Sequence, residues 1–140
     1  MRPIRREEDT TGAADDILAA LKGVPGFRAA AVLSPSGAVL ASLAPGDVDL
    51  ETIAEEANRT LVQSKEALCE MGAGRGELVY IEGSEARILA QCIDETDDGV
   101  GFQPGRAHIH GVLVLRPEGQ FGMGKLRLAE AMGTLRELYR

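Results

Sequence analysis

Hydrophobic and polar positions follow a helical spacing over one long central stretch of the chain. Between Asp49 and Met71, apolar residues recur at steps of three and four, at Leu50, Ile53, Ala54, Ala57, Leu61, Leu68 and Met71. Asp47 or Asp49 can cap the start, and Gly72 lies where a helix-ending glycine is expected. The opposite face is polar apart from one valine and carries Glu51, Glu55, Asn58, Arg59, Val62, Lys65 and Glu66. This helix can therefore place one face on a core and offer the other to water or to a partner.

The same spacing predicts two further helices. The first follows Thr10 or Thr11 as its N-cap and ends near Gly23, with apolar residues at steps that fit one helical face. The last runs from about Met123 to Tyr139 and also has a single apolar face.

Five short apolar runs predict β-strands, and they lie at 28–34, 38–43, 77–82, 86–93 and 109–115. A Ser-Pro-Ser-Gly turn joins the first two runs and a Gly-Ser turn joins the next two, so both pairs are expected to be β-hairpins. The runs are apolar throughout rather than alternating, which is typical of strands that are covered on both faces.

The order of these elements predicts the fold class. Residues 1–11 are charged and without apolar periodicity, so we expect a flexible N-terminal tail followed by one domain over 12–140. The elements follow in the order helix, hairpin, helix, three strands and helix. This order favours an α/β (α+β) fold in which helices cover both faces of a largely antiparallel sheet.

Composition limits the classes of partner. The chain has a net charge of −7 at pH 7 and an isoelectric point near 4.8. An acidic chain repels phosphate backbones and anionic lipid headgroups, so neither nucleic acid nor a membrane is expected as a partner. Cys69 and Cys92 are too few for a disulfide framework and are interpreted as free, buried thiols. With no apolar leader or spanning run, these features predict a cytoplasmic protein.

One pattern points to metal chemistry. His108 and His110 lie on one side of a strand, and two histidines at this spacing can ligate a metal. The loop before them, Asp94–Ala107, supplies carboxylates at Asp94, Glu95, Asp97 and Asp98. A complete four-ligand motif is absent from the sequence, so exposed surface histidines are the favoured interpretation and a metal-binding sensor or enzyme is the alternative. The sequence predicts no catalytic residue, no metal and no cofactor.

Several phrases of the sequence resemble the roadblock/dynein light chain family, which in bacteria includes MglB-like GTPase regulators. Leu21–Phe27 resembles the Val-Pro-Gly turn after that family's first helix. Val32–Ser42 is similar to its first hairpin, in which a Ser-x-x-Gly turn precedes a Leu-Ala-Ser strand. The order of elements agrees from about Ala14 to Tyr139, while Asp94–Ala107 is longer than the family's usual connection and is a candidate binding element.

The resemblance implies a fold and a dimer. It implies a five-stranded antiparallel sheet with helices one and three on one face and helix two on the other. Family members pair through strand three, so the implied dimer interface consists of Leu78, Val79, Tyr80 and Ile81. Physical reasoning agrees, because an apolar edge strand left without a neighbour promotes aggregation.

The resemblance also implies a function. Family members bind or regulate small Ras-like GTPases through the second helices of the dimer, or act as adaptors, without catalytic residues of their own. The implied contact residues are Glu51, Glu55, Asn58, Arg59, Val62 and Lys65. We therefore expect a homodimeric regulator of a small Ras-like GTPase, and a scaffold subunit that leaves hydrolysis unchanged is the alternative.

Overall fold

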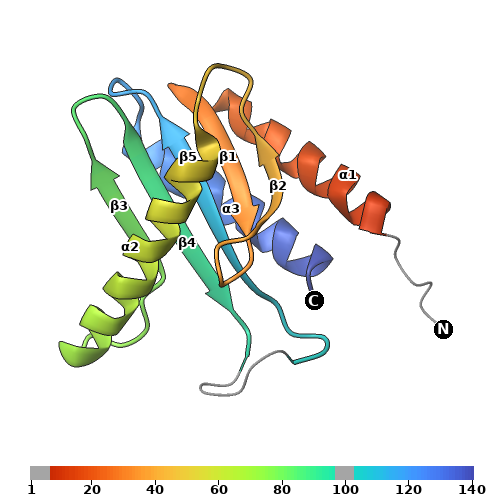
Figure 1. Ribbon diagram of the computed structural model, residues 1–140, viewed down its shortest axis with the longest axis vertical. Helices are drawn as coiled ribbons and strands as arrows, with labels where there is room; N and C mark the ends of the chain where they lie inside the picture. The colour runs from red at the N-terminus through yellow and green to blue at the C-terminus, as the bar shows by residue number, and fades with distance from the viewer. Residues whose placement is uncertain (1–6, 97–102) are drawn as a thin grey trace.

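A computed structural model describes residues 7–96 and 103–140 of the chain (Figure 1). The predicted order of helices and strands is confirmed. The elements are α1 (Glu7–Ala19), the short 3-10 turn η1 (Ala20–Gly23), β1 (Phe27–Leu33), β2 (Val39–Leu43), α2 (Leu50–Glu70), β3 (Leu78–Glu82), β4 (Arg87–Asp94), β5 (His108–Leu115) and α3 (Phe121–Leu138).

The strands form one antiparallel sheet in the order β2-β1-β5-β4-β3. Strand β5 is therefore central, and β2 and β3 form the two edges. Helix α2 packs on one face, while α1 and α3 pack on the other (Figure 1). This arrangement confirms the predicted five-stranded fold and the placement of its helices.

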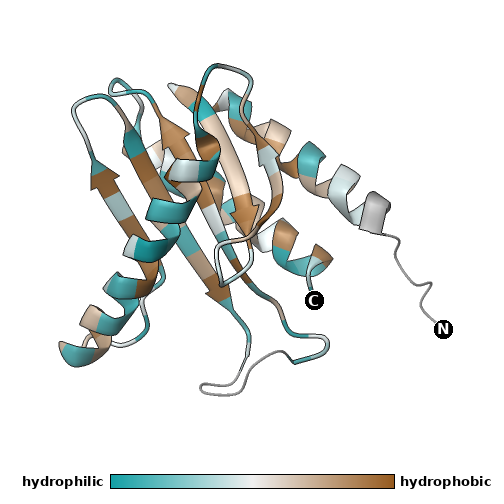
Figure 2. Ribbon diagram, viewed as in Figure 1, coloured by the Kyte–Doolittle hydropathy of each residue, from teal (hydrophilic) through white to brown (hydrophobic). Residues whose placement is uncertain are grey.

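The sheet has a separate core on each face, which explains why the strands are apolar throughout (Figure 2). In β1, Ala30 and Val32 pack beneath α1 and α3, while Ala29 and Ala31 pack beneath α2. Successive side chains of a strand point to opposite faces, so a strand between two helical layers needs apolar residues at every position.

Local signals bound helix α2 as the sequence predicts. The carboxylate of Asp49 accepts a hydrogen bond from the Thr52 backbone N–H at 3.2 Å, so Asp49 is the N-cap. Gly72 has a φ of 68°, and the next N–H returns to the carbonyl of Leu68 at 2.9 Å. A left-handed residue after the last turn is how helices commonly end, and glycine adopts it without steric cost.

Helix α1 begins at Glu7, so the expected tail over residues 1–11 is too long; residues 1–6 lie outside the described residues. Acidic residues are favourable in the first turn of a helix, and a prediction based on apolar spacing does not take this preference into account.

The predicted apolar face of α2 is also too long. Its buried residues end at Leu61, and Met71 is 74% exposed. Within the described residues, no helix is both long and apolar enough to cross a membrane.

Close packing of α3 on the central strand requires a glycine. A Cβ atom on Gly111 would collide with the sulfur of the fully buried Met132. We predict that Gly111→Ala lowers the free energy of unfolding by about 1–3 kcal/mol, the usual cost of overpacking a core. Urea denaturation followed by circular dichroism measures this change.

Gly133→Ala is the matched control, because a Cβ atom there meets nothing within 4 Å. Alanine is the better helix former, so this variant is expected to gain up to about 1 kcal/mol. Equal stabilities of the two variants would contradict the packing argument.

Candidate functional site

Strand β3 presents a free edge. At its two ends, the Cys92 N–H binds the Glu77 carbonyl and the Gly83 N–H binds the Ala86 carbonyl. In an antiparallel pair, successive residues alternate between bonding to the partner strand and pointing their N–H and C=O groups away from it. The backbone groups of Leu78, Tyr80 and Glu82 therefore point away from β4, toward a side where the described residues place no strand.

The predicted interface residues Leu78, Val79, Tyr80 and Ile81 are all half-buried. The Tyr80 ring lies against Phe121 at the start of α3, with 4.4 Å between the ring centroids. Phe121 remains 39% exposed, so the edge of β3 is continuous with an accessible aromatic ring.

The outward face of α2 carries four of the six predicted contact residues. Glu51, Glu55, Arg59 and Val62 are exposed. Arg59 forms ion pairs with Glu55 at 3.7 Å and with Glu56 at 3.3 Å, and all three side chains are more than half exposed. Exposed pairs of this kind contribute little to stability, so Arg59 can exchange them for a partner's carboxylate at low cost.

Asn58 is buried, which corrects its assignment to the outward face. Its side chain is 7% exposed and lies over β5 and the first hairpin. The amide Nδ2 donates to the Pro35 carbonyl at 3.3 Å, and Oδ1 lies 2.6 Å from Nδ1 of His110. Residues three and four positions from a core-facing residue share its side of the helix, so Ala54 and Leu61 carry Asn58 inward with them.

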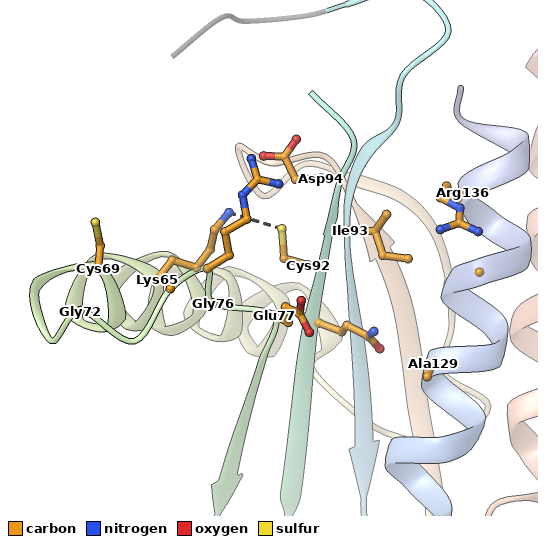
Figure 3. A pocket seen from close by; sticks show the side chains of 14 residues that line it. Lys65, Cys69, Gly72, Gly76, Glu77, Cys92, Ile93, Asp94, Ala129 and Arg136 are labelled. Carbon is orange, nitrogen blue, oxygen red and sulfur yellow. Dashed lines mark hydrogen bonds between the residues drawn. The ribbon is translucent and has the colours of Figure 1, made fainter. Parts of the chain in front are cut away.

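Lys65 is directed toward the sheet rather than outward. Its half-buried side chain donates from Nζ to Sγ of Cys92 at 3.3 Å (Figure 3). Of the six predicted contact residues, Asn58 and Lys65 thus belong to the packing between α2 and the sheet.

A cluster of Cys92, His108 and His110 lies beneath α2. The pairing of β4 with β5 places Cys92 opposite His110 and Asp94 opposite His108. Three side-chain atoms, one from each residue of the cluster, lie within 4.8 Å of one another. His110 is 1% exposed and His108 is half-buried, so the prediction of exposed surface histidines is wrong.

The geometry argues against a nucleophilic triad. Nε2 of His108 lies 3.7 Å from Cys92 Sγ and 3.8 Å from Asp94 Oδ2, so one nitrogen faces both groups. A triad uses opposite nitrogens of the ring for its nucleophile and its carboxylate. Burial also raises the pKa of the Cys92 thiol, against the pull of Lys65, which favours an unreactive thiol.

Burial keeps both histidines neutral. Desolvation lowers the pKa of His108, and it lowers the pKa of His110 to about 4. Neutral imidazole nitrogens and a sulfur are donors that can hold a transition metal.

A cleft opens beside this cluster, between the end of α2, the exposed edge of β4 and α3 (Figure 3). Lys65, Cys92 and Asp94 line one side of it, and Arg136 lines the other. Cys69 also lines the cleft and is exposed, which corrects the prediction that both thiols are buried.

The base of the predicted loop Asp94–Ala107 is closed by Glu95. Its N–H and a carboxylate oxygen pair with the backbone of Ala107 at 2.8 and 2.9 Å. Arg140 donates to the same carboxylate at 2.7 Å, and this contact holds the pKa of Glu95 at about 2. Residues 97–102, with the candidate carboxylates Asp97 and Asp98, lie outside the described residues.

The Roadblock/LC7 domain model matches residues 13–96, more than half of the chain. The chain belongs to the Roadblock/LC7 domain family. It is also similar to the Uncharacterized protein MJ0310 of Methanocaldococcus jannaschii, with 26% identity over 114 residues that cover 81% of this chain and 87% of that protein.

Two solved structures share this Roadblock/LC7 fold. Gliding protein mglB from Thermus thermophilus aligns with a TM-score of 0.74 and 19% identity, covering 93% of this chain and 90% of that chain. A structure described as MglB with tetrameric arrangement aligns with a TM-score of 0.75, 19% identity and the same coverage.

Within the Roadblock/LC7 fold, the sequence-based site residues divide into three groups. The edge of β3 and the outward residues of α2 are accessible, while Asn58 and Lys65 join the buried cluster. Sequence reasoning did not connect Cys92 to the histidines. The available signal was the spacing of Cys92 and Asp94, which repeats that of His108 and His110 on the neighbouring strand.

Asn58 provides a test of the buried polar contacts. Asn58→Leu keeps a similar volume but leaves the His110 Nδ1–H and the Pro35 carbonyl without their partner. Such losses cost roughly 1–3 kcal/mol of unfolding free energy, and chemical denaturation measures them. The neighbouring Arg59→Ala, on the exposed face, is expected to change stability by less than about 0.5 kcal/mol. Equal effects would place Asn58 on the surface after all.

Proposed function

We propose that this Roadblock/LC7 protein is a cytoplasmic homodimer that regulates, or acts as an adaptor for, a small Ras-like GTPase. The observation that carries the proposal is that the outward face of α2 is accessible. Resemblance to the Roadblock/LC7 family implies that a GTPase binds at this helix. The protein itself contributes binding and positioning in this proposal, not a catalytic residue.

The free edge of β3 supports the dimer. Leu78, Tyr80 and Glu82 direct backbone donors and acceptors outward, and two antiparallel copies of β3 would satisfy them in one continuous sheet. Phe121 and Tyr80 would add apolar area beside this ladder. In the proposed dimer, the two α2 helices come to the same face of the extended sheet.

The composition of the α2 face supports a protein partner. Val62 is 37% exposed, and the exposed charged residues Arg59 and Glu66 lie three positions before it and four positions after it on the same helix. An apolar centre with a charged rim is a common arrangement in transient protein interfaces. Glu51 extends the charged rim toward the start of the helix.

Two substitutions of Tyr80 test the dimer. Tyr80→Ala and Tyr80→Pro both remove the ring that packs on Phe121, but only proline removes the outward N–H. We expect the alanine variant to retain a dimer and the proline variant to be monomeric at micromolar concentration. Light scattering after size exclusion measures the mass, with circular dichroism confirming a folded sheet. Dimers of undiminished stability in both variants would rule out pairing through β3.

A pair of charge reversals tests the α2 face. Tagged protein is mixed with native lysate loaded with GDP or a non-hydrolysable GTP analogue, and captured proteins are identified by mass spectrometry. We expect a small GTPase, and its affinity for purified protein should fall roughly 30-fold in Arg59→Glu if this residue is a hot spot. Lys125→Glu makes the same kind of change on exposed α3, across the sheet, and should leave affinity unchanged.

The rate of GTP hydrolysis then separates the two roles. Acceleration by the wild-type protein, lost in Arg59→Glu, identifies a regulator. Binding with an unchanged rate identifies an adaptor. If no GTPase is captured with either nucleotide, or if Lys125→Glu weakens binding as much as Arg59→Glu, the proposed use of α2 is wrong.

A further inference from the structure

The buried cluster beneath α2 contains a polar atom that the packing does not satisfy. Within the described residues, Nε2 of His110 is buried and has no hydrogen-bond partner. Buried polar atoms normally have a hydrogen-bond partner, because burying one without a partner loses its hydrogen bonds to water and destabilises the fold. One nitrogen of His110 lies within 4.8 Å of Cys92 Sγ and of a His108 nitrogen. Because Nδ1 already contacts Asn58, the unpartnered Nε2 is the nitrogen left to hold a ligand beside these side chains.

Asn58 determines which nitrogen of His110 carries the proton. Because Asn58 Nδ2 donates to the Pro35 carbonyl, its Oδ1 is the atom that faces His110. That oxygen can only accept, so the proton of the neutral ring resides on Nδ1. Nε2 is left with a free lone pair. An oxygen that holds the far side of a histidine in this way is the usual second contact of a metal-binding imidazole.

The distances are close to those of a metal site. In a tetrahedral zinc site with bonds of about 2.0–2.3 Å, neighbouring ligand atoms are roughly 3.3–3.6 Å apart. Here Cys92 Sγ and His108 Nε2 are 3.7 Å apart, and all three donors lie within 4.8 Å. His108 is partly exposed, so its ring has room to rotate toward the other two donors.

Asp94 adjoins the set through His108 and lies outside the three residues whose donors gather within 4.8 Å. Its Oδ1 accepts from the backbone N–H and the hydroxyl of Thr96, which fixes the carboxylate. Its Oδ2 is directed to His108 at 3.8 Å. Because Cys92 and Asp94 line the open cleft, an ion has a route from solvent to the cluster.

Lys65 already places a positive charge at this position. Its ammonium lies 3.3 Å from Cys92 Sγ, on a half-buried side chain at the cleft. A flexible lysine can swing into the cleft when a cation takes its place. The site thus accommodates positive charge, and Lys65 competes with any ion that binds.

We propose that Cys92, His108 and His110 bind Zn²⁺ or a similar borderline divalent ion, with Asp94 as the fourth ligand and Asn58 holding His110. The ion replaces the thiol proton of Cys92, which is released to solvent, and both imidazoles bind in their neutral forms. The ion joins β4 to β5 beneath α2 and displaces the Lys65 ammonium. This site is independent of the proposed GTPase function.

Cobalt titration of the purified full-length protein tests the site. The protein is treated with a chelator, dialysed and titrated with Co²⁺, followed by competition with Zn²⁺. We expect a thiolate-to-cobalt charge-transfer band, intense visible bands of a tetrahedral ion, one ion per chain, and loss of all bands when Zn²⁺ is added. Absence of the charge-transfer band, or the weak spectrum of octahedral Co²⁺, overturns the proposal.

Variants identify the ligands. Cys92→Ser should abolish the charge-transfer band, and Cys69→Ser, at the exposed second thiol, should retain it. His108→Asn and Asp94→Asn should weaken binding by at least tenfold. Asn58→Ala should do so by about 10–100-fold, the usual effect of an outer contact. A band that survives in Cys92→Ser overturns the proposal.

Lys65→Gln is expected to bind the ion more tightly, whereas damage to the fold would weaken binding. Because the ammonium competes with the ion, this variant is expected to bind Co²⁺ and Zn²⁺ more tightly than the wild type. Zn²⁺ should also raise the Tm of the wild type and of Lys65→Gln but not of Cys92→Ser. Weaker binding in a folded Lys65→Gln protein would contradict the assigned position of the ion.

Discussion

The pairing of β4 with β5 is the constraint on which the rest of the structure depends. It places Leu89 beside Leu113 in the core under α3, and Cys92 beside His110 in the layer under α2. A shift of one residue would turn both sets to the wrong faces. The same pairing leaves β3 at the sheet edge, because β5 is already occupied by β1 on its other side.

Helix α2 acts on both of its sides because of this constraint. Ala54, Ala57 and Leu61 attach it to the sheet through small and apolar contacts. Asn58 and Lys65 extend that attachment to the buried sulfur and imidazole groups. The outward residues remain accessible on the same rigid element, so any surface they form is held at a fixed height above the sheet. Rigid elements position binding residues more accurately than loops do.

The predictable parts of the fold were those set by local chemistry. Asp49 caps α2 through its own side chain, and Gly72 ends the helix through a backbone conformation that other residues avoid. The hairpin turns and the two-sided apolar strands were equally local. Predictions about the site failed where a neighbour distant in sequence decided the outcome. Asn58 looks like a surface residue until β5 brings His110 to it, 52 positions away in the chain.

The sequence by itself determined the order of helices and strands, the two-layered burial of the sheet and the family resemblance, because periodicity and turn residues act over a few positions. Only the tertiary structure decided the neighbours of each polar group. It placed Cys92, His108 and His110 together and left the edge of β3 open. Outside the two hairpins, strand pairing joins residues far apart in the chain, and no local pattern encodes that β5 lies between β1 and β4.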